Sequence, residues 1–226
     1  FFESSSNNLL SSLKIIDLAN KSNLPVVYAS SSAVYGNLKL GNDRVSTSEI
    51  LSPYAQDKLT LEDYFKMAFD IYGLSSIGLR FFNVYGPKQD PSNPYSGVIS
   101  IFIDSLLSKK PVKVNGGFQT RDFIFVDDIV KILVESLLIL KKRQCSFFNV
   151  GTGTSISIDR LLKILIKLTS TNPKIIRKDL PKGDPKESSG SYEKLEKILN
   201  VKIKTFHDLE SGLEKTLKYY KDGWWA

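Results

Sequence analysis

Apolar positions along this chain follow two patterns, and the two patterns alternate over most of its length. Short apolar runs bounded by polar or turn-forming residues indicate buried strands of a parallel sheet. Longer stretches with apolar residues three or four positions apart indicate helices that bury one face. The predicted strands cover residues 26–29, 76–82, 112–114, 122–126 and 147–150, and a basic strand follows Pro173.

The predicted helices fill the intervals between these runs. Pro53 is typical of a helix start, and Asp127 or Asp128 is expected to cap a later helix. The predicted helices cover residues 7–20, 53–72 and 98–107, a segment from 127 to about 140, a segment with Leu161, Leu162 and Leu165, and two C-terminal segments ending near Tyr220.

The remaining residues indicate loops and define the class of fold. Residues 37–48, 83–94 and 181–190 are polar or rich in Pro, Asn and Gly, which predicts loops. Because strands and helices alternate, the sequence predicts an α/β fold with a parallel sheet, followed by a smaller and more irregular C-terminal part.

Composition narrows the class of protein. The chain has 226 residues, of which 42% are hydrophobic and 24% charged, so it can bury a real core. A single Cys145 excludes a disulfide framework and offers no thiolate cluster, and no metal site is expected. The sequence has no apolar run that could span a membrane and no secretory leader, so we expect a cytoplasmic protein.

The net charge of +7 comes mostly from lysines that are scattered along the chain. This distribution favours solvated helix faces or a phosphate-bearing substrate. A nucleic-acid-binding surface would need a matching motif or interleaved aromatic residues, and the sequence has neither. We therefore expect no nucleic-acid partner.

Tyr54 and Lys58 are candidates for proton transfer. Four residues apart on a helix, they leave the same face, and an ammonium beside a phenol lowers the pKa of the tyrosine. The spacing alone is weak support, since Tyr35 and Lys39 share it, but Gly36 between them indicates a loop.

A glycine-containing segment at 151–154 imitates a dinucleotide-binding loop. It follows a predicted strand and precedes a predicted helix, but Ile156 occupies the third glycine position. No acidic residue stands about 20 positions further on to bind a ribose hydroxyl. We interpret the segment as a structural turn.

Five motifs together resemble the extended short-chain dehydrogenase/reductase family, in particular its NAD-dependent nucleotide-sugar epimerases. The order and spacing of the set are far more specific than any one piece. The motifs are Val27-Tyr28-Ala29-Ser30-Ser31-Ser32-Ala33-Val34-Tyr35-Gly36, Ser52-Pro53-Tyr54 with Lys58, Leu79-Arg80-Phe81-Phe82-Asn83-Val84-Tyr85-Gly86-Pro87, Gln119-Thr120-Arg121-Asp122-Phe123 and Phe148-Asn149-Val150-Gly151-Thr152-Gly153.

The resemblance implies a doubly wound Rossmann-type parallel sheet with a smaller mixed substrate domain. We expect residues 1–87 and 122–150 to form part of the NAD-binding domain, and residues 88–121 and 151–226 to form the substrate domain. The family's opening strand, Gly-rich phosphate loop and helix are not in the sequence, so roughly 80 to 90 residues of the family pattern are missing. Because the chain begins with Phe1, we expect an N-terminally truncated fragment that binds NAD poorly.

The resemblance also implies roles for the motif residues. Tyr54 would be the base, Lys58 would stabilise its phenolate and hold the nicotinamide ribose, and Ser31 would bind the sugar oxygen that loses a proton. The residues expected to contact NAD are Ala29, Ser30, Tyr54, Lys58 and Phe81.

Substrate contacts are carried over in the same way. Arg121 matches the arginine that grips the diphosphate, and Asp184 matches an acid that binds ribose hydroxyls. The family usually has an arginine near that acid; no clear counterpart stands in this sequence, where Lys182 would take its place. A later aspartate of the family pattern is Ser191 here. Val98 and Val114 match positions that line the nucleotide pocket, and ordinary core packing is the alternative role for both. The full set expected to bind a UDP-sugar is Ser31, Ser32, Asn83, Val98, Val114, Arg121, Asp184 and Ser188.

The reaction expected from the resemblance is 4-epimerisation of a UDP-sugar. Sugar dehydratases carry two carboxyl groups where this chain has Ser32 and Ala33, and UDP-glucuronate decarboxylases carry a glutamate at the position of Ala33. Ser188 falls where family members set pocket size, and its small side chain would admit an N-acetyl group. UDP-glucose and UDP-N-acetylglucosamine are therefore both candidate substrates. The pathway could be surface-polysaccharide synthesis or galactose use.

Alternatives remain open beside this reading. The chain could belong to another reaction of the family, such as UDP-glucuronate epimerisation or dehydration, or it could be a non-catalytic remnant that binds sugar nucleotides. The family also implies a homodimer, in which the first helix and the Tyr54 helix pair into a four-helix bundle.

Overall fold

A three-stranded parallel sheet forms the centre of the molecule in the computed structural model, which describes residues 2–42, 49–93, 96–140, 144–199 and 201–222. Its strands β1 (Val26–Ser31), β3 (Ser76–Phe81) and β7 (Cys145–Val150) lie in the order β1-β3-β7. The last residues of the three strands are paired with one another: Ser31 lies opposite Phe81, and Phe81 lies opposite Val150. The carboxyl ends of the strands therefore lie at one edge of the sheet.

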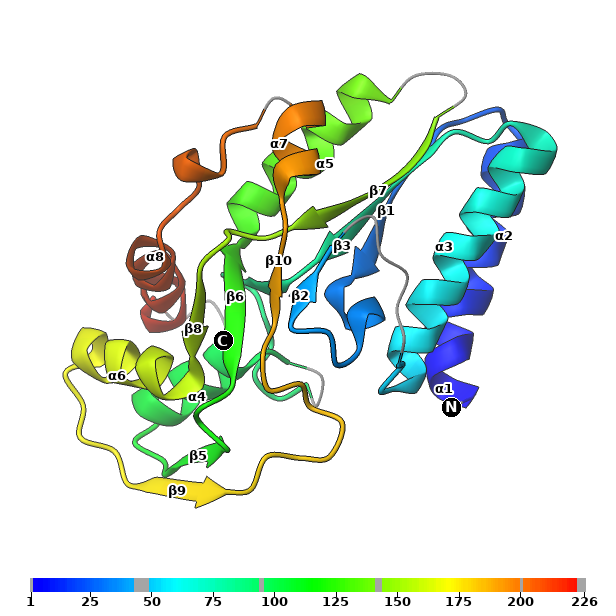
Figure 1. The fold of residues 1–226 in the computed structure, drawn as a ribbon. Helices are drawn as coiled ribbons and strands as arrows, with labels where there is room; N and C mark the ends of the chain where they lie inside the picture. The colour runs from blue at the N-terminus through cyan, green and yellow to red at the C-terminus, as the bar shows by residue number, and fades with distance from the viewer. Residues whose placement is uncertain (1, 43–48, 94–95, 141–143, 200, 223–226) are drawn as a thin grey trace.

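Helices cover both sides of this sheet (Figure 1). On one side, α2 (Ser11–Lys21) and α3 (Pro53–Tyr72) bury a cluster that includes Ile16 and Phe65. On the other side, α5 (Val126–Ile139) packs against the sheet, and α7 (Glu193–Leu199) packs against β7 and α5. Ahead of α2, α1 (Phe2–Ser5) and η1 (Ser6–Leu10), a π-helical turn, extend the first helix toward the N-terminus.

The boundaries of α3 follow from local signals. The hydroxyl oxygen of Ser52 accepts the backbone N–H of Ala55 at 3.1 Å, and Pro53 occupies the first turn, where its missing N–H costs nothing. Gly73 ends the helix with φ of 76°, a left-handed conformation that favours glycine. The predicted helix at 53–72 is confirmed.

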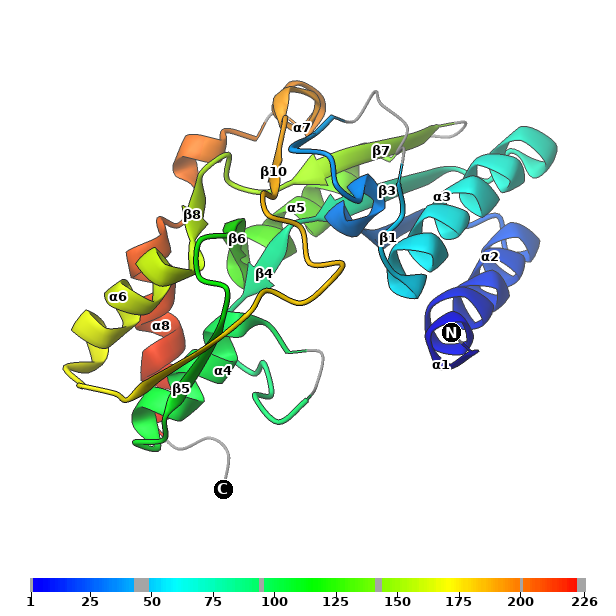
Figure 2. The ribbon, with the colours of Figure 1, turned by 60° about the horizontal axis from the view of Figure 1, so that its bottom comes forward.

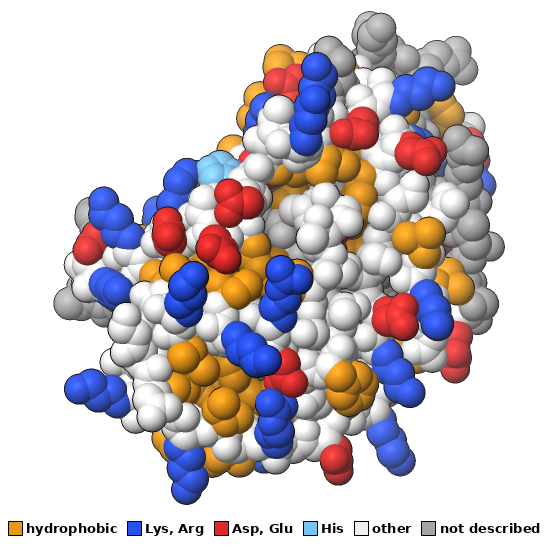
Figure 3. Space-filling model, turned by 60° about the vertical axis from the view of Figure 1, so that its left-hand side comes forward, with side chains coloured by type: hydrophobic (Ala, Val, Ile, Leu, Met, Phe, Trp, Pro, Cys, Tyr) orange, Lys and Arg blue, Asp and Glu red, His pale blue; other side chains and the backbone are white. Residues whose placement is uncertain are grey.

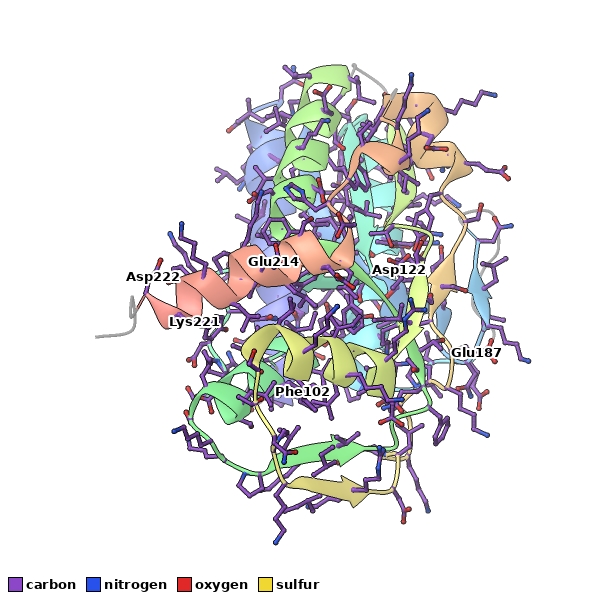
Figure 4. The ribbon with its side chains drawn as sticks, turned by 90° about the vertical axis from the view of Figure 1, so that its left-hand side faces the viewer. Phe102, Asp122, Glu187, Glu214, Lys221 and Asp222 are labelled. Carbon is purple, nitrogen blue, oxygen red and sulfur yellow. The ribbon has the colours of Figure 1, made fainter. Side chains whose placement is uncertain are left out.

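A second, mixed part carries the remaining elements. Strand β6 (Thr120–Phe125) pairs in parallel with β4 (Asn83–Tyr85) and antiparallel with β8 (Ser155–Ser157) (Figure 2). Around it, one large apolar core includes Phe102, which points into the space beside α6 in Figure 4. The other elements of this part are α4 (Val98–Leu107), α6 (Ile158–Thr169), α8 (Leu209–Lys221), η3 (Ile203–Thr205), and the parallel pair β5 (Val112–Asn115) and β9 (Ile175–Lys178).

The predicted α/β class with a parallel sheet and a smaller mixed part is confirmed, but three local predictions are wrong. Residues 83–85 form β4 instead of a loop, because β6 supplies a pairing partner. Within the expected loops, β2 (Leu40–Gly41) and β10 (Ser189–Gly190) pair in parallel. Residues 43–48 of the first loop and Pro94 of the next lie outside the described residues.

The expected aspartate cap of α5 is also wrong. Phe125 is the N-cap, and it makes no side-chain capping bond. Asp127 and Asp128 lie inside the first turn, where their charge favours the helix dipole. Asp128 accepts the backbone N–H of His207 at 2.9 Å, so its carboxylate anchors the segment that leads to α8.

The glycine segment after β7 is a structural turn, as predicted, and a carboxylate fills it. Asp122 is fully buried and accepts the backbone N–H groups of Thr152 and Gly153, each at 2.9 Å at the closest. The Thr152 hydroxyl donates to it at 2.7 Å and the Tyr192 hydroxyl at 2.5 Å. Figure 4 shows Asp122 inside the fold, at the strands that meet there. The amides of this turn therefore already have an anionic partner.

The charge on the surface and the character of the helices complete the description of the fold. On the face shown in Figure 3, basic side chains are spread widely and acidic ones stand among them. This distribution fits solvated faces, as the scattered lysines predict. Among the described residues, no helix combines the length and the apolar character needed to cross a membrane.

We expect Asp122→Asn to destabilise the fold by about 2–3 kcal/mol, because the amide nitrogen would face N–H donors in a buried site. Urea unfolding measures the free energy of unfolding. Asp127→Asn removes the same charge from an exposed position and should change it by less than about 0.5 kcal/mol. Equal effects of the two substitutions would contradict the assigned role of Asp122.

Candidate active site

A cavity of about 270 Å³ lies at the carboxyl ends of β1 and β3. Ligands of α/β proteins bind at this edge of the sheet. Its wall is built from the end of β1, η2 (Ser32–Tyr35), the start of α3, the β3–β4 junction and the loop before β10. The wall includes the following residues expected to contact substrate or cofactor: Ser31, Ser32, Phe81, Asn83, Arg121 and Ser188.

Strand alternation separates the serines at the end of β1. Ser30 is buried and its hydroxyl donates to Glu62, whereas Ser31 reaches the cavity. The Ser31 hydroxyl oxygen accepts the backbone N–H of Ala33 at 3.1 Å, which caps η2 and leaves the hydroxyl proton available to a ligand. The Ser30 hydroxyl, expected at the cofactor, is therefore engaged in the interior, and only its backbone could contact NAD.

Tyr54 and Lys58 leave the same face of α3, one turn apart. The Lys58 Nζ lies 5.7 Å from the centre of the Tyr54 ring and donates to the carbonyl of Ala29 at 2.9 Å. Tyr54 is 41% exposed and stands beside the cavity, whose wall contains its neighbours Ser52 and Ala55. The arrangement links α3 to the end of β1 through Lys58 while leaving Tyr54 partly exposed.

The surroundings of Lys58 act on its charge in opposite directions. Burial lowers the pKa of Lys58, and the neighbouring Asp57 carboxylate raises it. Asp57 is itself buried, and the hydroxyls of Ser4 and Ser5 donate to its two oxygens at 2.5 and 2.7 Å. The first helix thus holds the anion that favours the charged form of Lys58.

The competing pair has no such geometry. Tyr35 lies in η2, a 3₁₀ turn that ends at Gly36, so Tyr35 and Lys39 share no helical face. Tyr35 is 3% exposed, and its hydroxyl donates to the Asn149 side chain at 2.7 Å. Lys39 lies at the surface and pairs with Glu187 at 3.8 Å.

A second cavity of about 460 Å³ shares Asn83 and Arg121 with the first. Arg121 is buried. Its Nη1 donates to the Thr120 carbonyl at 2.7 Å, and its Nη2 donates to the Asp184 carboxylate. Arg121, expected at the diphosphate, thus stands where the two cavities meet, and Asp184 fixes its orientation. Val98 also lines the second cavity.

Val114 does not line either cavity; it is fully buried in the core of the second part. In β5 the even-numbered positions point inward and the odd-numbered ones outward, so Lys113 faces the second cavity instead. Lys178 of β9 joins it. Neither lysine was among the site residues expected from the sequence, although the apolar–polar alternation of residues 112–115 indicated that Lys113 faces outward.

Comparisons with known proteins identify the family of this chain. The family model described as "NAD dependent epimerase/dehydratase family" matches residues 3–151. A putative UDP-glucose 4-epimerase of Methanocaldococcus jannaschii is 33% identical over 219 residues, which are 95% of this chain and 69% of that protein. UDP-glucuronate 4-epimerase 3 of Arabidopsis thaliana is 33% identical over 213 residues, or 86% of this chain and 48% of that protein.

A solved structure is similar over the same length. The UDP-N-acetylglucosamine 4-epimerase from Methanobrevibacter ruminantium M1, in complex with UDP-N-acetylmuramic acid, is 32% identical with a TM-score of 0.88. The match covers 96% of this chain and 70% of that one. The chain therefore spans from about half to about two thirds of the relatives it matches. On the family model and on these relatives, it belongs to the NAD dependent epimerase/dehydratase family.

Proposed function

We propose that the protein containing this chain is an NAD-dependent UDP-sugar 4-epimerase that oxidises and then re-reduces one carbon of the sugar. The observation that carries the proposal is that Ser31, at the end of β1, lines one cavity together with Ser52 and Ala55 at the start of α3. Lys58 of α3 donates to the Ala29 carbonyl of β1 and lies 5.7 Å from the Tyr54 ring. Serine, tyrosine and lysine are the groups that such a proton transfer needs, and no further acid or base is required.

The residues of this chain fit the nicotinamide end of NAD. Lys58 has three donors, of which one is on the Ala29 carbonyl, so the others can reach a ribose. The glycine turn at 151–153 is filled by Asp122 and offers no pyrophosphate cradle. Bound NAD would supply the acceptor and donor for the hydride that leaves the sugar carbon and returns to it.

Tyr54 is the group that takes the proton from the sugar hydroxyl. The nearby Lys58 ammonium stabilises the phenolate, and the Ser31 hydroxyl donates to the oxygen that loses the proton. Return of the proton from Tyr54 completes the cycle, so the residues end as they began. In this mechanism Lys58 must stay charged, and the buried Asp57 supports that state.

Arg121, Asn83 and Asp184 bind the nucleotide end of the substrate. A guanidinium fork suits a diphosphate, and Asp184 is placed to hold the fork and to accept from a ribose. Lys113 and Lys178 add positive charge to the same cavity. We also assign residues 1–87 and 122–150 to the NAD-binding part and residues 88–121 and 151–226 to the substrate part.

We propose an N-acetylated UDP-sugar as substrate, beside UDP-glucose. Ser188 lies in the wall of the first cavity, where its small side chain leaves space. The similar solved structure is a UDP-N-acetylglucosamine 4-epimerase, which supports this choice. The Arabidopsis relative is a UDP-glucuronate 4-epimerase, and that sugar is the second candidate.

A homodimer is proposed as the assembly. The faces of α2 and α3 that point away from the sheet carry exposed apolar side chains, which a partner helix pair would bury. These side chains are Ile15, Leu18, Tyr64, Met67, Ile71 and Tyr72.

Tyr54→Phe should lower kcat by about 10²–10⁴-fold, because it removes the proton acceptor, and should leave UDP-sugar affinity unchanged. The assay uses the complete reading frame that contains this chain and follows UDP-N-acetylgalactosamine, UDP-galactose and UDP-glucuronate. Tyr219→Phe, at a half-buried tyrosine of α8 that lines neither cavity, is the matched control.

Three outcomes of this assay would change the proposal. Turnover of UDP-galactose without UDP-N-acetylgalactosamine would exclude the N-acetylated substrate. Turnover of UDP-glucuronate alone would make the second candidate correct. UDP-sugar binding by a wild-type protein that turns over none of the three would identify a non-catalytic binding protein.

Asp57→Asn should lower the pKa of Lys58 further, because it removes the charge that opposes the effect of burial. NMR titration of the lysine side-chain signals, with Lys58→Arg to assign the signal, measures this pKa. Asp63→Asn removes an exposed carboxylate from the same helix and should have a much smaller effect. A Lys58 pKa that is unchanged in Asp57→Asn would show that Asp57 does not support its charge.

Met67→Lys combined with Ile71→Lys should convert the dimer to a monomer at micromolar concentration, because two buried charges would oppose the interface. Sedimentation velocity gives the mass. Val134→Lys combined with Leu138→Lys places the same two charges on exposed apolar positions of α5 and should leave the dimer intact. A wild-type monomer, or dissociation by the control alone, would refute this interface.

A further inference from the structure

A buried polar network lies below the candidate active site and has no role in the chemistry proposed above. It consists of five side chains from five different elements, and each is 7% exposed or less. The five are Ser30 of β1, Tyr35 of η2, Glu62 of α3, Arg80 of β3 and Asn149 of β7.

The centre of the network is a two-pronged ion pair. The Arg80 Nε donates to one oxygen of Glu62 at 2.8 Å, and its Nη2 donates to the other at 2.6 Å. The remaining Nη1 donates to the Tyr35 hydroxyl at 2.8 Å. Glu62 also accepts from Ser30, so its carboxylate ties α3 to β1 and β3 at once.

Four of the five members connect the network to the site. Ser30 precedes Ser31, and Arg80 precedes Phe81, so the network holds the ends of the two strands that border the cavity. Glu62 follows Lys58 by one helical turn and Tyr54 by two, which puts all three on one face of α3. Tyr35 belongs to the cavity wall itself.

Stability alone does not explain a charged pair in this position. Taking two charges out of water is costly, and apolar replacements of buried ion pairs are often neutral or stabilising. Apolar contacts between α3 and the sheet are non-directional, however, and permit small shifts of the helix. A bidentate arginine–carboxylate pair fixes both distance and angle.

We propose that Glu62, through its ion pair with Arg80, is a positioning residue that sets where Tyr54 and Lys58 stand relative to Ser31. The inference rests on the proposed function for its effect on catalysis, but the effect on α3 can be measured without it. A misplacement of reacting groups by about 1 Å can cost about 10²-fold in rate, so a small shift of the helix matters.

The test replaces both charges together, so that no unpaired charge is left behind. We expect Glu62→Met with Arg80→Met to keep the thermal stability and the KM of the wild type, and to lower kcat by about 10–100-fold. Hydrogen exchange of the backbone amides of residues 55–58 should become faster, while exchange in α5 stays unchanged. Leu61→Met with Ile77→Met is the matched control, since it repacks buried positions of the same two elements and should alter none of these quantities strongly.

The exchange measurement separates failure of this inference from failure of the proposed function. If the wild type turns over no UDP-sugar, faster exchange confined to the start of α3 still supports the positioning role. Unchanged kcat and exchange in the double variant would overturn it. So would a general loss of protection with a lower melting temperature, because that result would show a purely structural role.

Discussion

In the central sheet, Ser31 of β1 lies opposite Phe81 of β3, and Phe81 lies opposite Val150 of β7. The three strands therefore end level, and the chain leaves each of them at the same edge. Ser32, Asn83 and the turn filled by Asp122 follow directly. A shift of one residue in this register would reverse which side chains face the cavity, because alternation in a strand has a period of two. The position of Ser31, and of the Ala29 carbonyl to which Lys58 donates, depends on this pairing.

Two buried carboxylates near this edge have the same kind of surroundings. Asp122 is surrounded by N–H and O–H donors, and Glu62 by a guanidinium and a hydroxyl. Each carboxylate joins segments that are distant in sequence, because a charged group in the interior requires several partners to offset its desolvation. Such groups supply direction where apolar packing does not. The apolar clusters hold helices against the sheet, and the carboxylates determine how the segments line up.

Much of the fold was predictable where signals are local. The helix at 53–72 has a serine cap, a proline in its first turn and a glycine at its end, and each acts within a few residues. The strand at 83–85 was missed because its partner, β6, lies about 40 residues further along the chain. Nothing within 83–85 distinguishes a strand from a loop until that partner is present. The aspartate cap of α5 failed for a related reason, since Asp128 is engaged by a segment near His207.

The same division applies to the site. The motifs around Ser31, Tyr54 and Arg121 identify the family and the candidate chemistry by themselves, because residue type and spacing along one element are local properties. Only the tertiary structure decided that Ser30 turns inward to Glu62, that Val114 belongs to the core, and that Lys113 and Lys178 come together at one cavity. Side-chain direction depends on which face of an element meets the core, and that is settled by packing between segments far apart in sequence.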